Sequence, residues 1–108
     1  MAGTFTSYVA KNVGASAATV LTVAAATTTT VIGLSVANTS VADITVSVYF
    51  TRSAVDYYVI KTALVPAGST FILSGGDQKI VLITADALKV VSSAATSADV
   101  IASVLELT

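Results

Sequence analysis

Hydrophobic and polar residues alternate along several short segments of this chain. The clearest segment runs from residue 44 to 51, where Thr, Ser and Tyr residues separate four apolar ones. These four are Ile44, Val46, Val48 and Phe50. Successive side chains of a β-strand point to opposite faces, so the alternation predicts a strand with these four residues turned toward a core.

Similar segments recur along the whole chain. We predict strands at about residues 5–12, 18–25, 28–38, 42–52, 56–64, 69–74, 79–84, 87–93 and 98–107. Two of them, around 59–64 and 100–107, are partly apolar on both faces, which is typical of a sheet covered on its second side as well. Short strands at regular spacing predict an all-β fold, a single-domain antiparallel β-sandwich over residues 1–108, with a small β-barrel as the alternative. Residues 1–13 can also be interpreted as an extended N-terminal arm.

Turn-forming residues separate these segments. They stand at 38–40, 52–56, 65–68, 75–77, 84–86 and 94–98. The sequence Val65-Pro66-Ala67-Gly68 predicts a type I turn, because Pro presets φ at the second position and Gly suits the fourth. Gly75 and Gly76 provide the positive-φ freedom of a hairpin turn.

The alanine-rich segment 15–26 is the one place where a helix competes with a strand. Alanine has the highest helix propensity, but here it is flanked by Val and Thr, which favour strands. We therefore predict no helix of three or more turns in this segment. The same region resembles a secretory signal peptide, yet Thr19 and Thr22 interrupt its apolar stretch, and a first hairpin is the better interpretation.

The composition argues against two classes of function, membrane insertion and nucleic-acid binding. The chain is 55% hydrophobic and only 10% charged, where an average domain has about a quarter of its residues charged. Unbroken apolar runs of at most four residues suit strands and are too short for a membrane-spanning helix, so we expect no membrane insertion. Five cations are scattered singly along a chain of net charge −1, which gives no basic patch for nucleic acid.

The residues of catalysis are scarce. The sequence has no His, Cys or Trp, so it has no imidazole base, thiol nucleophile, disulfide or thiolate metal site. The carboxylates stand mostly at predicted turns and strand ends, where Asp commonly caps a turn. Gly75-Gly76-Asp77 is a weak calcium motif in a single copy. We expect no enzyme activity, no cofactor and no metal.

Aromatic residues are the best candidates for an interface. Tyr57 and Tyr58 are adjacent in a predicted strand and must point to opposite faces, one toward the core and one toward the surface. We select Phe5, Tyr8, Tyr49 and Tyr57 as candidate interface residues, because aromatics are enriched where proteins meet. Flat, uncharged strand faces without lysines also favour close approach of another sheet.

Six stretches of the chain carry a recognisable strand-and-turn pattern. They are GLSVANT at 33–39, DYYVIK at 56–61, VPAGST at 65–70, GGDQK at 75–79, LKV at 88–90 and SVLE at 103–106. Together they resemble a group of small β-sandwich virion proteins of tailed bacteriophages. The resemblance implies a head decoration (cement) protein, or alternatively a neck, tail or fibre-attachment protein. It carries no catalytic residues.

The expectation from this resemblance is a structural protein of the virion, assembled in the host bacterial cytoplasm. It would form a homo-oligomer, with a trimer favoured, and clamp neighbouring major capsid subunits through many repeated contacts. A secreted adhesion or carbohydrate-binding module is the alternative from another class. That function would require exposed aromatics along a groove.

Overall fold

The computed structural model describes residues 3–73 and 80–108. Over these ranges the chain forms nine β-strands and no helix. The strands are β1 (Gly3–Val13), β2 (Ala18–Thr22), β3 (Thr28–Asn38), β4 (Ile44–Arg52), β5 (Val55–Val65), β6 (Thr70–Leu73), β7 (Ile80–Leu82), β8 (Ala87–Ser92) and β9 (Ala98–Leu107). The predicted strands and the prediction of no long helix at 15–26 are confirmed.

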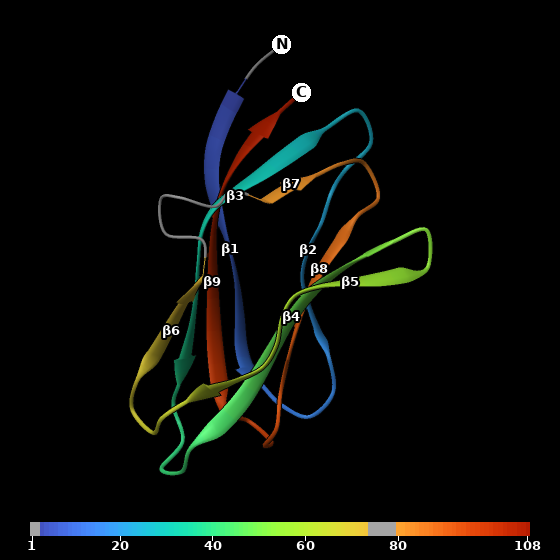
Figure 1. The fold of residues 1–108 in the computed structure, drawn as a ribbon. Coiled ribbons are helices and arrows are strands. Elements are labelled where there is room, and N and C mark those ends of the chain that lie inside the picture. Colours follow the sequence, from blue (N-terminus) through green and yellow to red (C-terminus); the bar gives the residue numbers. More distant parts are fainter. Residues whose placement is uncertain (1–2, 74–79) are drawn as a thin grey trace.

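The strands form two antiparallel sheets that pack face to face (Figure 1). Sheet A has the order β1-β9-β3-β6, and β7 pairs with β3 beside β6. Sheet B has the order β2-β8-β4-β5. Two separate sheets make this a β-sandwich, which confirms the first of the two predicted architectures.

The core lies between the sheets and consists mainly of branched aliphatic side chains. Ile44, Val46 and Val48 of β4 are at most 2% exposed, and Phe50 packs against the same cluster at its margin. The alternation predicted for this strand is therefore confirmed. Burying a Val, Leu or Ile side chain contributes about 1.5–3 kcal/mol, so this layer carries most of the favourable free energy of folding.

The turn between β5 and β6 shows how backbone conformation sets a strand connection. Ser69 N–H donates to the Pro66 carbonyl at 3.0 Å, and Gly68 has a φ of 73°. Pro66 is therefore the first residue of the turn and Gly68 the third, which corresponds to type II. The type I turn predicted one residue earlier is wrong, because the positive φ places Gly68 at the third position. The predicted hairpin at 75–77 lies outside the described residues.

The N-terminal segment is part of a sheet. β1 pairs antiparallel with β9 from Gly3 opposite Leu107 to Val13 opposite Ala98, with an irregularity after Ala10. Residues 3–13 thus form the edge strand of sheet A in the single chain, not a detached arm. The start of β1 and the end of β9 therefore lie at the same end of the sandwich (Figure 1).

Two polar side chains connect loops to the sandwich. Asn38, 3% exposed at the end of β3, donates to the carbonyl oxygens of Ala42 and Val65 at 2.8 and 3.0 Å. Asp86, 1% exposed before β8, accepts hydrogen bonds from Arg52 and from the backbone N–H of Ile83. Buried polar groups require such partners, so each side chain fixes the geometry of its loop.

Candidate assembly surface

The outer face of sheet A carries large apolar side chains that no other part of the described chain covers. Along β9, Val100, Ala102 and Val104 point into the core, so Ile101 and Ser103 point outward. The strand register adds further outward side chains from β1, β6 and β7. The exposed large apolar residues of this face are Phe5, Val9, Ile72, Val81 and Ile101, which are between 51% and 74% exposed.

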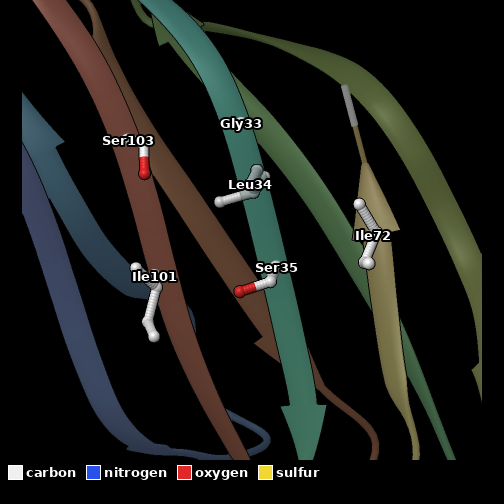
Figure 2. A pocket seen from close by; sticks show the side chains of 6 residues that line it. All are labelled: Gly33, Leu34, Ser35, Ile72, Ile101 and Ser103. Carbon is white, nitrogen blue, oxygen red and sulfur yellow. The ribbon is translucent and has the colours of Figure 1, made fainter. Parts of the chain in front are cut away.

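These side chains form a row across the sheet. Val9 is opposite Ile101, Ile101 is opposite Ser35, and Ser35 is opposite Ile72. Residues directly opposite one another in neighbouring strands lie on the same face about 5 Å apart. Figure 2 shows Ile101 on β9, Ser35 on β3 and Ile72 on β6 along three adjacent strands. Small residues in the middle of the row leave a depression between larger ones.

That depression is a shallow, open hollow of about 200 Å³ (Figure 2). It is lined by Gly33, Leu34, Ser35, Ile72, Ile101 and Ser103. A Cβ atom added at Gly33 would meet no other atom within 4 Å, so glycine is not required there by crowding within the chain. The hollow is lined by few polar atoms and by no charged group, which suits an apolar side chain.

One edge of this face is the long strand β1, most of which is uncharged. Residues 3–10 of β1 contain no Asp, Glu, Lys or Arg. In the described part of the chain, β1 pairs on one side with β9 and with no strand on the other side. Backbone N–H and C=O groups on that side are therefore directed toward solvent.

The first charge on β1 is Lys11, and it is neutralised. Its Nζ atom lies 3.2 Å from Oδ2 of Asp99, while the Asn12 N–H donates to Oδ1 at 3.0 Å. The backbone hydrogen bond from Asn12 and the nearby ammonium lower the pKa of Asp99. The outer face therefore has one compensated ion pair at this corner.

The four predicted interface residues do not form one site. Phe5 lies on the outer face of sheet A and is 74% exposed. Tyr8 lies on the opposite side of β1, packs against the core and donates to the carboxylate of Glu106, which raises the pKa of Tyr8. Tyr49 and Tyr57 belong to sheet B. Of the four, Phe5 alone contributes to the apolar face described above.

The tyrosines of sheet B form aromatic pairs. Tyr49 is 8% exposed and packs against Tyr58 with ring centroids 4.8 Å apart, and its burial raises the pKa of Tyr49. Tyr57 stacks on Phe50 at 5.4 Å. Tyr57 and Tyr58 do point to opposite faces, as predicted. The prediction that one of them is in the core is wrong, because they are 49% and 47% exposed on the outermost strand of sheet B.

Sequence reasoning missed the aliphatic part of the surface, namely Val9, Ile72 and Ile101. A signal was present, since the segment 100–107 is apolar on both strand faces. Period-two alternation cannot tell which of two apolar faces is covered by the chain itself. The register of β9 between β1 and β3 provides that information.

The described residues contain no group of three or more His, Cys, Asp or Glu side chains placed to hold a metal ion. No helix in the described ranges has the length and hydropathy of a membrane span.

The fold and surface define a class of small, two-sheet antiparallel β-sandwiches. No protein-family model matches the sequence, and the comparison with curated proteins finds no match. Among solved structures, the chain is similar to one from Bacillus endospore appendages, which are described as forming a novel family of disulfide-linked pili. The TM-score is 0.58 with 15% sequence identity over 98% of this chain and 88% of the other. This likeness supports the fold.

Proposed function

We propose that this chain is a non-enzymatic structural subunit that works by packing against copies of itself and against a partner protein. The observation that carries this proposal is the outer face of sheet A. Phe5, Val9 and Ile72 are each about 70% exposed there, beside an apolar hollow. Isolated soluble domains seldom leave a contiguous apolar area of this kind exposed, and such areas mark interaction sites.

The particular assembly we propose is a tailed-phage virion, in which the chain acts as a head decoration protein. The sequence resemblance at residues 33–39, 56–61 and 65–70 to small virion proteins of tailed phages supports a virion protein, and head decoration is the position we favour. A closed oligomer such as a trimer over a joint between major capsid subunits would bury the apolar face and repeat the contact by symmetry. A neck or tail position would use the same surface.

A filament subunit is the second candidate, and the structural similarity to a pilus protein favours it. The pili of that similar protein are disulfide-linked. This chain contains no cysteine, so copies of it would have to associate through non-covalent contacts. A long edge strand that is uncharged over residues 3–10 and an apolar sheet face are suitable for such contacts.

The adhesion alternative has less support. Tyr57 and Tyr58 are the exposed tyrosines, and they point to opposite faces of β5. Side chains on opposite faces cannot line one groove. A sugar-stacking platform would therefore require aromatic residues that this surface does not bring together.

Electron microscopy and sedimentation can test the proposal. The purified chain is sedimented at increasing concentration, and antibody-gold labelling then locates the native protein in particle and cell-surface fractions of its source culture. Gold on phage heads would support decoration, and gold on filaments would support the second candidate. A chain that remains monomeric at millimolar concentration and labels neither fraction would contradict a structural role.

A further inference from the structure

We infer that two copies of this chain pair along β1, antiparallel and with Ser7 at the two-fold axis, so that sheet A continues across both molecules. This inference rests on the proposed function, which states that copies of the chain associate. It adds the particular strand edge through which two copies meet.

The first argument is the nature of the edge. Proteins usually protect an exposed edge strand with a charge, a proline, a bulge or short length. β1 has 11 residues, and positions 3–10 contain neither charge nor proline. Its pairing with β9 is regular from Gly3 to Ala10, so the open side is an uninterrupted row of backbone donors and acceptors. A second β-strand is the ligand that satisfies such a row.

The second argument is the symmetry of the side chains about Ser7. In an antiparallel pair centred on this residue, Phe5 lies opposite the partner's Val9, and Val9 lies opposite the partner's Phe5. Phe5 and Val9 point to the same outer face and are 74% and 69% exposed. Aromatic and β-branched residues form favourable cross-strand pairs. The small Ser7 at the axis leaves room for two copies of itself.

The third argument is continuity with the surface already described. Val9 stands at the end of the apolar row that runs through Ile101 and Ser35 to Ile72. Pairing along β1 would place the partner's Phe5 next to Val9 and join the rows of two molecules. No like charges would meet in the central part of this pair, and Lys11 beyond it is already bound by Asp99.

The other edges are less suited to the same contact. β5 has two register irregularities against β4, a positive φ of 51° at Thr62, and the cation of Lys61. Bulges and lysines at an edge oppose further pairing. β2 has only five residues and an irregular register against β8.

β1 also has an irregularity, a positive φ of 56° at Asn12 and the cation of Lys11, but these follow Ala10 and leave residues 3–10 regular. β6 and β7 have only four and three residues. Residues 3–10 of β1 are therefore the longest regular, uncharged strand edge in the described part of the chain, and the edge to which a second copy would add.

Cysteine cross-linking can test this register, since the chain has no native cysteine. Ser7→Cys should form a disulfide-linked dimer on mild oxidation, because the two residues face each other at the axis. Phe5→Cys and Val9→Cys should each fail to cross-link with themselves, yet link when mixed. Like positions would be about 13 Å apart along the strands, too far for a disulfide. Thr39→Cys, exposed after the end of β3, is the control that should not cross-link.

Charge exchange provides a second measurement that does not depend on disulfide geometry. Ser7→Lys places two cations at the axis and should raise the Kd of the dimer at least tenfold, whereas Thr39→Lys should leave it unchanged. Mixing Ser7→Lys with Ser7→Glu should restore a heterodimer. Ser7 is exposed, so thermal melting should show all three variants folded.

Two results would overturn the inference. One is that Phe5→Cys cross-links with itself as readily as with Val9→Cys, which excludes this register. The other is that Ser7→Lys associates as well as wild type, which excludes the edge. In the latter case the proposed function survives if the copies still associate through another surface. It fails separately if the wild-type chain sediments as a monomer and labels no assembly.

Discussion

The guanidinium of Arg52 binds the buried carboxylate of Asp86 through two nitrogen atoms. Nη2 lies 2.6 Å from Oδ2, and Nε lies 2.9 Å from Oδ1. The Ile83 N–H also donates to Oδ2 at 2.9 Å, and the Asp86 carbonyl accepts from Val23 N–H at 2.9 Å. The pair thereby connects the end of β4 with the turn before β8 and the segment after β2. The hydrogen bonds from Arg52 hold the pKa of Asp86 below its usual range.

Asp86→Asn should destabilise the fold by about 2 kcal/mol, because it weakens hydrogen bonds to a charged group that is 1% exposed. Urea unfolding followed by circular dichroism measures this change. Asp56→Asn is the matched control, since Asp56 is an exposed carboxylate bonded to the Thr51 hydroxyl at 2.8 Å. It should change stability by less than about 0.5 kcal/mol. Equal decreases in the free energy of unfolding for both variants would show that the buried Arg52–Asp86 pair stabilises the fold no more than an exposed carboxylate does.

The same residue predicts a pH dependence. The folded-state pKa of Asp86 is lowered, so its contribution is present above the unfolded pKa of about 3.9 and is lost as the pH falls through the lower folded value. Asp99 has a lowered pKa as well and acts in the same direction. The difference in unfolding free energy between wild type and Asp86→Asn isolates the first group. It should be constant from about pH 5 to 7 and shrink below about pH 4. A difference that grows on acidification would contradict this assignment.

Asn38 is a second buried polar residue on which a loop depends. Its amide donates to Ala42 and Val65 carbonyls, and its Oδ1 accepts from the backbone N–H of Ser40 at 2.9 Å. Asn38→Ala would leave buried groups without partners and should cost about 2–3 kcal/mol in a thermal or chemical melt. Thr39→Ala, at the exposed neighbouring position, is the control and should be nearly neutral. A neutral Asn38→Ala would show that water replaces the amide.

The sequence predicted the strands well, because their signal is local. Period two at 44–50 and the turn residues at 38–40 depend on near neighbours, and both agree with the structure. The order of strands in the sheets has no such local signal. It depends on contacts between distant parts of the chain, since β9 near the C-terminus pairs with both β1 and β3. The predicted turn at Pro66 is one residue too early, because a Pro followed by a Gly two residues later is compatible with a turn that begins at Val65 or at Pro66.

The sequence predicts that an apolar interaction surface exists, but it locates only part of that surface. Low charge and strands apolar on both faces indicated a covered sheet, and aromatic content led to Phe5. The same rule led to Tyr49, which the structure places under Tyr58 with 8% exposure. Ile72 and Ile101 have the same residue type as core positions, so only the pairing of strands distinguishes them.

Adjacent residues in β9 allow stability and assembly to be separated. Val100 is 1% exposed in the core, while Ile101 is 51% exposed on the outer face beside the hollow. Val100→Ser removes a buried side chain and introduces a hydroxyl into the core, so it should lower the free energy of unfolding by about 3 kcal/mol. Ile101→Ser should change that free energy by less than about 1 kcal/mol, because half of its side chain is already in water.

Association should follow the opposite order. Ile101→Ser removes the apolar residue at the centre of the row between Val9 and Ile72, so the concentration for half-maximal association in sedimentation should rise at least fivefold. Val100→Ser, measured at a temperature where it remains folded, should associate like wild type because its side chain never reaches the surface. Thr39→Ser, a substitution at an exposed position outside the apolar row, is the control and should associate like wild type. If Ile101→Ser associates as well as wild type while Val100→Ser does not, the outer face of sheet A is not the contact surface, and assembly depends on fold stability alone.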